Sequence, residues 1–160
     1  ALSFYPELKE VEIEFVEQKL KTTMAARPLP KSVFQKTGKR QYRIFINNTD
    51  SCEIPLRTIP FNAQIGIIGH ELAHIVDYER SSGPGIMGAG LNYATARTKA
   101  GFEKRIDLLT IEKGLGWQLY DWADFAINHS VASADYNAFK ARTYLKPLEI
   151  LNQIRESAQY

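Results

Sequence analysis

A single cysteine is all that the 160 residues contain, so no disulfide can form within the chain. A lone Cys52 fits a reducing compartment but does not exclude an exported protein. The sequence also lacks any apolar run that approaches the roughly 20 residues of a membrane-spanning helix, so we expect no integral membrane segment. It starts at Ala1 without methionine, which favours a processed or exported protein. Trimming of a longer chain gives the same start, so the compartment stays open.

A surplus of one charge is missing too. The 20 Lys and Arg residues nearly balance the 18 Asp and Glu residues, and a net charge of +2 gives no reason to expect a nucleic-acid partner or an anionic membrane surface. Repeats and low-complexity segments are absent, and no shift in composition marks a boundary. A length of 160 residues suits one domain of ordinary size, so we predict a single domain over residues 1–160. Its oligomeric state is not indicated.

The order of the predicted elements indicates the fold class. Apolar and charged residues alternate at 11–15 and 42–46, the period of a half-buried strand, and the threonines at 20–24 favour a further extended segment. Residues 54–59, interrupted by Pro55, are irregular or an edge strand. Helices are predicted at residues 62–78, 95–113, 117–127, 134–144 and 147–158. This order predicts an α+β fold: a small mixed or antiparallel N-terminal sheet, then the helix at 62–78, then a helical C-terminal half.

Histidine is scarce, yet two of the three histidines share one short motif. Residues 69–74 read GHELAH, and on a helix residues four apart lie on one face. His70 and His74 can therefore point both imidazoles at a single ion. Glu71 projects beside that ion, where it can accept a proton from a metal-activated water. The motif predicts two metal ligands and a base.

Two histidines leave a catalytic zinc one protein ligand short, because such sites usually hold three protein ligands and a water. One class of zinc enzymes places the third ligand six residues after the second histidine, but that position is Arg80, which excludes the class. Asp77 lies on the same helix, where its short side chain is poorly directed. Glu103, on the next long helix, is the better third ligand. Asp107, one turn later, can accept the second ring N–H of a zinc-bound histidine.

Residues 103–107 could also be a charged helix face exposed to solvent. The upstream motif favours the interpretation of Glu103 as a metal ligand over this simpler one. HELAH joined to a separate helix carrying Glu-Lys-Arg-Ile-Asp resembles the gluzincin group of zinc metallopeptidases, and among them the small minigluzincins. The resemblance covers residues 62 to about 119. It implies Zn²⁺ bound by His70, His74 and Glu103, and peptide hydrolysis with Glu71 as general base and acid. The substrate would be an extended peptide or protein, held beside a sheet edge expected at 42–46 or 54–59.

Two roles stay open in the sequence. The oxyanion that forms during peptide hydrolysis needs a further hydrogen-bond donor. His129, in a loop after a helix, is our candidate, although lone histidines are commonly structural or exposed. Cys52 could block the open metal position in a latent form, against the simpler alternative of a small buried residue. Other candidates for the oxyanion donor are Tyr93, Tyr120, Tyr136 and Tyr144.

The glycines near the motif carry expectations of their own. Gly66 and Gly69 are poor helix formers, so we expect another backbone to pass close to them. Asn62 is a suitable N-cap for the motif helix. The glycine-rich residues 81–90 predict a mobile loop at the rim of the site.

The sequence as a whole predicts a zinc peptidase. The alternative is a non-catalytic or latent zinc-binding domain with the same frame, which binds peptides or partner proteins. A third reading takes HELAH as a core helix whose histidines form ion pairs. The presence of Glu71 favours the enzyme, because loss of this base or a filled fourth coordination site would mark a non-catalytic domain.

Overall fold

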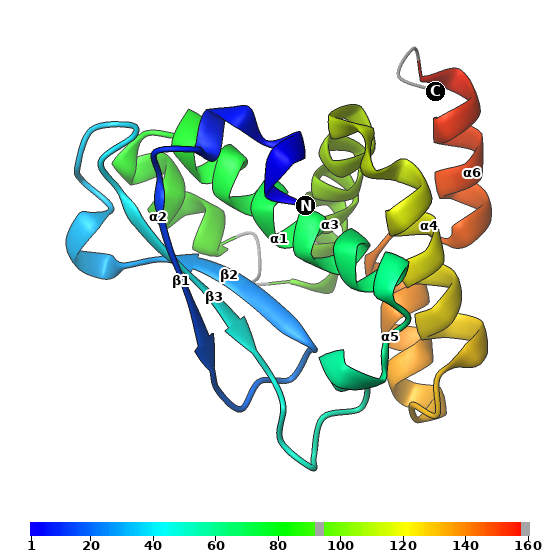
Figure 1. Ribbon diagram of the computed structural model, residues 1–160. Coiled ribbons are helices and arrows are strands. Elements are labelled where there is room, and N and C mark those ends of the chain that lie inside the picture. Colours follow the sequence, from blue (N-terminus) through cyan, green and yellow to red (C-terminus); the bar gives the residue numbers. More distant parts are fainter. Residues whose placement is uncertain (92–94, 158–160) are drawn as a thin grey trace.

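The computed structural model describes residues 1–91 and 95–157 and has the predicted α+β architecture, a mixed sheet followed by helices (Figure 1). The strands are β1 (Glu12–Glu17), β2 (Met24–Pro28) and β3 (Gln41–Ile46). They lie in the order β1-β3-β2, with β1 parallel to β3 and β2 antiparallel to it. β3 is therefore the central strand, and β2 forms one edge of the sheet.

Two predicted strands are confirmed, and the third is displaced. β1 and β3 cover the two alternating segments, but the extended segment expected at 20–24 lies mostly in the connection before β2. β2 also runs through Pro28, although proline has no backbone N–H to donate to a neighbouring strand. Proline fits there because Leu29 N–H donates to the Gln41 carbonyl at 2.8 Å, which turns the nitrogen of Pro28 away from β3.

The sheet edge expected to receive an extended substrate was wrongly placed. Residues 42–46 belong to β3, which pairs with a strand on each side. Residues 54–59 contain the short 3-10 helix η4 (Leu56–Thr58) and no strand. The edge that packs beside the motif helix belongs to β2.

Helices account for most of the described chain after residue 60. None of those within residues 1–91 and 95–157 is long and apolar enough to cross a bilayer. Short 3-10 helices also precede β1 and follow β2. The bounds are α1 (Phe61–Arg80), α2 (Gly83–Leu91), α3 (Ala96–Thr110), η5 (Ile111–Leu115), α4 (Gly116–Asp124), η6 (Phe125–His129), α5 (Ala134–Thr143), α6 (Pro147–Glu156), η1 (Leu2–Phe4), η2 (Pro6–Leu8) and η3 (Pro30–Ser32).

The segment expected to be a mobile loop is instead the helix α2. Ser82 starts it: its carbonyl accepts a hydrogen bond from Ile86 N–H at 2.9 Å, and its hydroxyl accepts one from Gly85 N–H at 3.2 Å. Pro84 suits the first turn, where its missing N–H costs nothing. Ile86 is buried in the core, so α2 is anchored by packing as well as by its cap.

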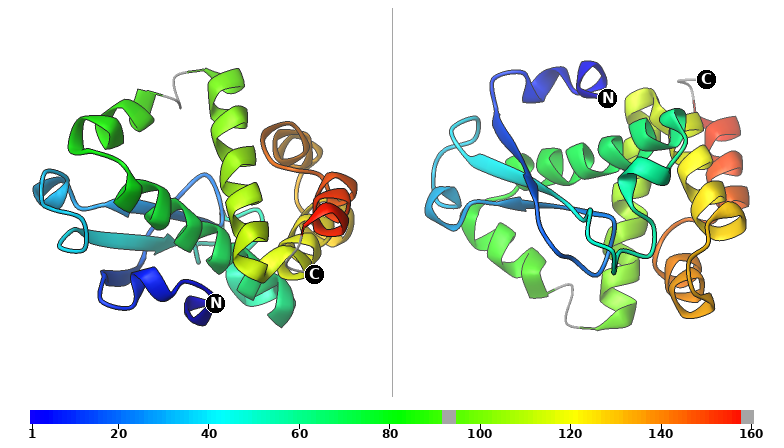
Figure 2. Two further views of the ribbon diagram at one scale, coloured as in Figure 1. Left: turned by 90° about the horizontal axis from the view of Figure 1, so that it is seen from above. Right: turned by 60° about the horizontal axis from the view of Figure 1, so that its bottom comes forward.

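α1 is the central element of the molecule. It packs against β2 and against α3 and α4. Figure 2 shows the strands on one side of α1 and helices α4 to α6 on the other. α1 begins at Phe61, one residue before the predicted N-cap Asn62, whose side chain instead donates a hydrogen bond to Asp121.

The predicted close approach of another backbone is confirmed at Gly66, whereas at Gly69 the nearest atoms belong to side chains. A Cβ on Gly66 would lie 2.1 Å from the carbonyl oxygen of Gln118 in α4. A Cβ on Gly69 would lie 2.5 Å from a methyl carbon of Leu115. The Gly69 carbonyl also accepts a hydrogen bond of 2.7 Å from the Tyr5 hydroxyl. Gly66 thus lets α4 approach the motif helix closely, and Gly69 leaves room for the side chain of Leu115.

Candidate metal centre

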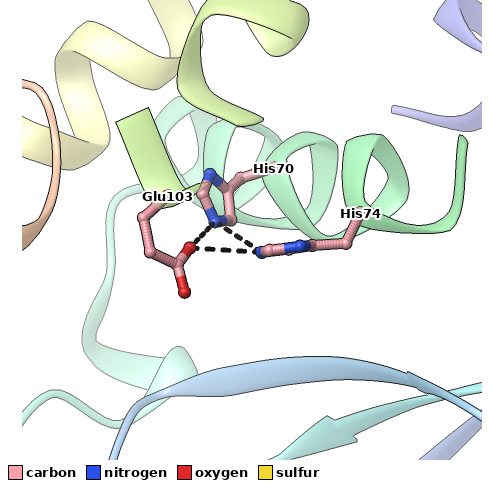
Figure 3. A group of neighbouring side chains, drawn as sticks. All are labelled: His70, His74 and Glu103. Carbon is pink, nitrogen blue, oxygen red and sulfur yellow. Dashed lines mark hydrogen bonds and ion pairs between the residues drawn. The ribbon is translucent and has the colours of Figure 1, made fainter. Parts of the chain in front are cut away.

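Three buried side chains from α1 and α3 meet at one point (Figure 3). The Nε2 atoms of His70 and His74 lie 3.1 Å apart, and Glu103 Oε2 lies 3.2 Å from each of them. The histidines occupy successive turns of α1, and α3 packs on α1 so that Glu103 faces them. His70, His74 and Glu103, named the triad below, could hold a metal ion.

The spacing of the triad suits a tetrahedral metal. Bonds of about 2.0–2.1 Å from zinc to nitrogen or oxygen, at tetrahedral angles, put two ligand atoms about 3.3 Å apart. The observed separations of 3.1 and 3.2 Å are close to that value. Two imidazoles and one carboxylate are also a donor set that zinc takes at catalytic sites. The triad therefore fits Zn²⁺.

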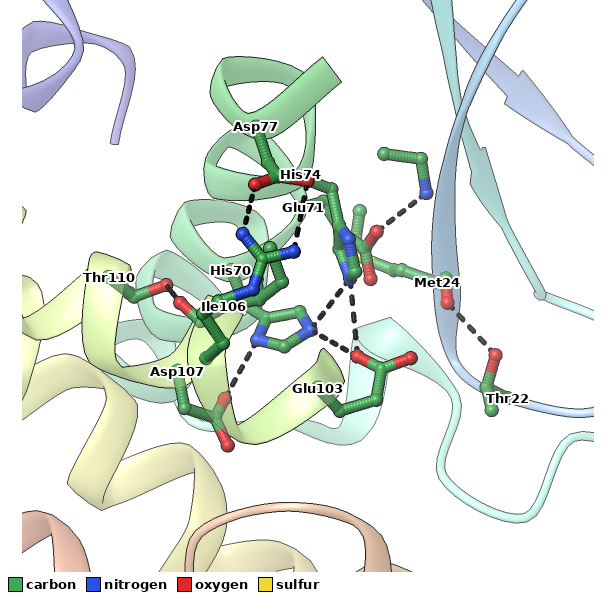
Figure 4. Close-up of polar contacts among 12 residues, drawn as sticks. Thr22, Met24, His70, Glu71, His74, Asp77, Glu103, Ile106, Asp107 and Thr110 are labelled. Carbon is green, nitrogen blue, oxygen red and sulfur yellow. Dashed lines mark hydrogen bonds and ion pairs between the residues drawn. The ribbon is translucent and has the colours of Figure 1, made fainter. Parts of the chain in front are cut away.

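Asp107, one turn after Glu103 on α3, orients the first histidine (Figure 4). Its Oδ1 lies 2.8 Å from His70 Nδ1, and its Oδ2 accepts a hydrogen bond of 2.8 Å from the backbone N–H of Leu145. The carboxylate holds the ring proton on Nδ1, which makes Nε2 of His70 the ring nitrogen that can bind a metal ion once its own proton is lost. Because Leu145 lies between α5 and α6, the C-terminal helices take part in building the centre.

Burial and neighbouring charge act in opposite directions on the triad. Burial lowers the pKa of His70, but hydrogen bonds to Asp107 and Glu103 outweigh it and raise that pKa to about 10. Burial raises the pKa of Glu103, whereas hydrogen bonds to both histidines bring it far below its ordinary range. In the metal-free protein the triad holds a proton, which a metal ion would have to displace.

His74 is oriented differently from His70. Its ring stacks on Tyr78 with 6.2 Å between centroids and lies 5.4 Å from the ring of Phe102. Its Nδ1 is buried and, within residues 1–91 and 95–157, has no hydrogen-bond partner. Aromatic packing therefore orients the imidazole of His74, whereas a carboxylate orients that of His70.

Glu71 faces the edge of the sheet. Its Oε2 accepts a hydrogen bond of 2.6 Å from the backbone N–H of Ala26 in β2. The triad, Glu71 and residues 24–27 of β2 line a pocket of about 730 Å³. That volume is within the range of ligand-binding clefts. A carboxylate base, three potential metal ligands and a strand edge thus share one cavity.

Tyr144 brings an aromatic hydroxyl to the same pocket from the residue after α5. Its ring lies edge-on to His70, with 5.6 Å between centroids. Behind it, the Nζ atom of Lys140 lies 3.9 Å from the Tyr144 ring centroid and 4.9 Å from that of Trp122. Burial, with the nearby carboxylates, raises the pKa of Tyr144 well above its ordinary value, so the hydroxyl keeps its proton.

Other residues considered from the sequence lie apart from the triad. His129 ends η6, where its side chain is 62% exposed and lies 3.0 Å from Asp124. Cys52 is a free, buried thiol outside the triad, and burial raises its pKa. The carboxylate of Asp77 pairs with Arg105. The structure therefore brings together His70, Glu71, His74, Glu103 and Asp107, but not His129 or Cys52.

The tyrosines considered as oxyanion donors differ in whether they line the pocket. Tyr93 lies outside the described residues. Tyr120 and Tyr136 do not line the pocket within the described part of the chain, whereas Tyr144 does. Tyr78, which sequence reasoning did not consider, also lines it, one turn of α1 after His74. That spacing was the signal available for Tyr78.

Three further contributors were missed from the sequence. Ala26 and Leu145 act through their backbone N–H groups, so their side-chain identities carry no signal. The sequence carried a weak signal for Lys140, because this residue lies four positions from both Tyr136 and Tyr144 and would share their face of a helix. A lysine on an aromatic face indicates a buried ammonium group held by ring contacts.

Comparisons of this chain with protein-family models, with curated proteins and with solved structures gave no match. The function therefore has to come from the chemistry of the triad, of Glu71 and of the pocket that they share.

Proposed function

We propose that the chain is a zinc-dependent peptidase, with residues 1–160 as one catalytic domain and Zn²⁺ held by the triad. The observation that carries this proposal is the position of Glu71. It follows the first triad histidine, lines the same pocket as the triad and lies against the β2 edge. Hydrolysis of an extended peptide needs a base between the metal ligands and the strand that holds the substrate.

When bound, zinc supplies a Lewis acid that polarises a carbonyl and lowers the pKa of water. Glu71 accepts the proton of the attacking water and then delivers it to the nitrogen of the departing amine, acting first as base and then as acid. The hydrogen bond from Ala26 N–H keeps the Glu71 carboxylate directed at the strand edge. Asp107 keeps His70 in the tautomer that leaves Nε2 unprotonated.

We assign the Tyr144 hydroxyl as the donor to the tetrahedral oxyanion. It lines the pocket, packs on His70 and keeps its proton at neutral pH. No described residue exchanges a hydrogen bond with this hydroxyl, so it is available to substrate. His129 stays a prediction for this role without support from its position, because its neighbour is Asp124 and the residues that line the pocket do not include it.

The substrate in this proposal is a peptide or protein segment that lies extended along β2. Asn47 N–H donates to the Thr23 carbonyl, and Leu29 N–H donates to the Gln41 carbonyl. In residues 23–29 the odd-numbered positions therefore turn their backbone groups toward β3 and toward Asn47, which follows it. The intervening residues turn their backbone groups toward the pocket, as the bond from Ala26 to Glu71 shows. An edge of this kind accepts an added strand.

One observation favours a second candidate, a non-catalytic or latent zinc-binding domain that binds peptides or partner proteins. The Ala26 N–H that Glu71 occupies is a donor on the edge where a strand would add. In this candidate Glu71 stays hydrogen-bonded to Ala26 and activates no water. Both candidates need zinc, and they differ in turnover.

The variant Glu71→Gln tests the proposal. The wild type and the variant are loaded with zinc, their metal content is measured, and both are offered a peptide library. We expect equal zinc content and a loss of about 10²–10⁴-fold in kcat/KM, the range for a general base. Glu112→Gln, an exposed glutamate in η5, is the matched control and should keep full activity.

Each outcome of this experiment decides one part of the proposal. Failure of the wild type to bind zinc would refute the proposed metal centre. Retained cleavage by Glu71→Gln would refute the assignment of Glu71 as the base. Peptide binding without cleavage by the zinc-loaded wild type would support the second candidate.

A further inference from the structure

Long basic side chains surround the pocket that contains the triad. Lys19 and Lys21 reach it from the connection between β1 and β2, Arg27 from β2, and Lys99 from α3. The first three are exposed. Because the chain carries a net charge of only +2, this concentration of positive charge is a local property of the pocket.

Negative charge at the pocket is confined to its centre. Among the described residues that line it, the carboxylates are Glu71 and Glu103, which are buried and already hydrogen-bonded. No described carboxylate forms an ion pair with Lys19, Lys21 or Arg27. These cations are therefore available to a ligand that enters the pocket.

We propose that the site takes acidic peptides, and that Lys19 and Lys21 on one flank and Arg27 on the other bind aspartate or glutamate side chains of an extended substrate. This deepens the proposed peptidase function and rests on it. The two lysines precede β2, and Arg27 lies near its end. A peptide along β2 therefore meets positive charge on both sides of the position opposite Glu71.

The distance between the flanks sets the spacing of the acidic residues. A strand rises about 3.3 Å per residue, so groups that bind at opposite ends of β2 are several residues apart in the substrate. The guanidinium carbon of Arg27 lies 5.5 Å from the Phe45 ring centroid, which restricts that flank, while lysine side chains are flexible. A terminal carboxylate could satisfy one flank but not both, which favours cleavage within a chain.

Binding is tested on zinc-loaded Glu71→Gln protein, which holds peptide without cleaving it. The probes are labelled peptides with glutamates on both flanks and the same peptides with glutamine in their place. We expect the acidic peptide to bind at least about tenfold more tightly at low salt, equivalent to about 1.4 kcal/mol. That advantage should shrink in about 1 M salt, where the screening length is about 3 Å.

Charge reversal locates the preference. Adding Lys19→Glu and Lys21→Glu to the Glu71→Gln protein should abolish the tenfold preference. Lys36→Glu with Lys39→Glu changes the net charge by the same amount at exposed positions between β2 and β3, outside the residues that line the pocket, and should leave the preference intact. Thermal melts of both double variants establish that they fold.

The possible results separate this inference from the peptidase proposal. Equal affinity for the acidic and amide peptides would overturn the inference, and so would a preference that both double variants keep. Cleavage is measured separately with the wild type. Cleavage of neutral and acidic peptides at equal rates would overturn the inference and keep the peptidase. Selective binding of acidic peptides without any cleavage would support the preference for acidic peptides and overturn the peptidase proposal.

Discussion

Lys140 is a buried lysine close to the carboxylates of the centre. Burial lowers its pKa from 10.5 to about 8, even though the carboxylates of Asp107, Glu103 and Glu71 attract the ammonium group. Below pH 8 the folded protein therefore carries a buried charge that the unfolded chain exposes to water. Its ring contacts with Trp122 and Tyr144 compensate only part of that cost.

This burial predicts a dependence of stability on pH. Between pH 8 and 10.5 the unfolded chain binds more protons at Lys140 than the folded protein, so this lysine makes the unfolding free energy rise with pH. Lys140→Met should remove that rise. Below pH 8 it should be more stable than the wild type by up to about 3 kcal/mol, since one pKa unit is equivalent to about 1.4 kcal/mol.

Urea unfolding of both proteins with chelator, at several pH values, measures the difference. Lys36→Met, at an exposed lysine, serves as control and should follow the wild-type dependence. Parallel curves for Lys140→Met and the wild type would show that the ammonium group is not buried as described.

At this scale, sequence patterns predicted the side chains that share a helix face. His70 and His74 meet because helix periodicity places them together, and Glu103 was expected because zinc needs a third donor from a neighbouring helix. The groups contributed by Ala26 and Leu145 are backbone amides, which every residue except proline has. Only the packing of distant segments selects them, so no pattern in the sequence could.

The contact between α1 and α4 gives a prediction at the scale of elements. Gly66→Ala should lower the unfolding free energy by about 1–3 kcal/mol, as overpacking does, despite the better helix propensity of alanine. The cause is the Gln118 carbonyl oxygen, 2.1 Å from where the new Cβ would lie. Gly101→Ala is the control, because nothing lies within 4 Å of its Cβ position in α3.

The control should gain about 1 kcal/mol from helix propensity alone. Denaturant unfolding of the two variants beside the wild type provides the comparison. A stabilisation of equal size in both variants would contradict the close approach of α4 to α1.

The elements differ in how well the sequence could predict them. The alternation is visible in β1 and β3: β3 buries Tyr42 and Ile44 in the core, whereas in β1 Ile13 is half-buried and Phe15 is exposed. β2 reads Met-Ala-Ala-Arg-Pro, which has neither alternation nor β-branched residues, so only its pairing with β3 identifies it. α2 was hidden by its glycines, although the serine cap and early proline that start it were present at Ser82 and Pro84.

At the scale of the whole molecule, a metal in the triad would join α1 to α3 and, through Asp107, to the joint between α5 and α6. Zinc at a hundred times its dissociation constant should stabilise the fold by about 2.7 kcal/mol. For a chain of this size that raises Tm by about 5–10 °C. Asp107→Asn should weaken zinc binding about 10–100-fold and reduce the stabilisation to about 0.4–1.4 kcal/mol at the same zinc concentration.

Thermal melts with zinc and with chelator measure these shifts. Asp77→Asn is the matched control, since its carboxylate pairs with Arg105 and touches no triad residue among those described. It should keep the full zinc-dependent shift. A full shift in Asp107→Asn would mean that the contact with His70 does not govern the affinity for metal.

The hydrogen bond from Leu145 to Asp107 has a consequence for synthesis on the ribosome. A nascent chain exposes His70, His74 and Glu103 long before residue 145 leaves the exit tunnel. Until then Asp107 lacks the amide that holds it, and Tyr144 is not yet in the pocket. Since domains fold as units during translation, the centre is completed only when α5 and the start of α6 have emerged. The centre would thus reach its full affinity for a metal only after the C-terminal helices have been made.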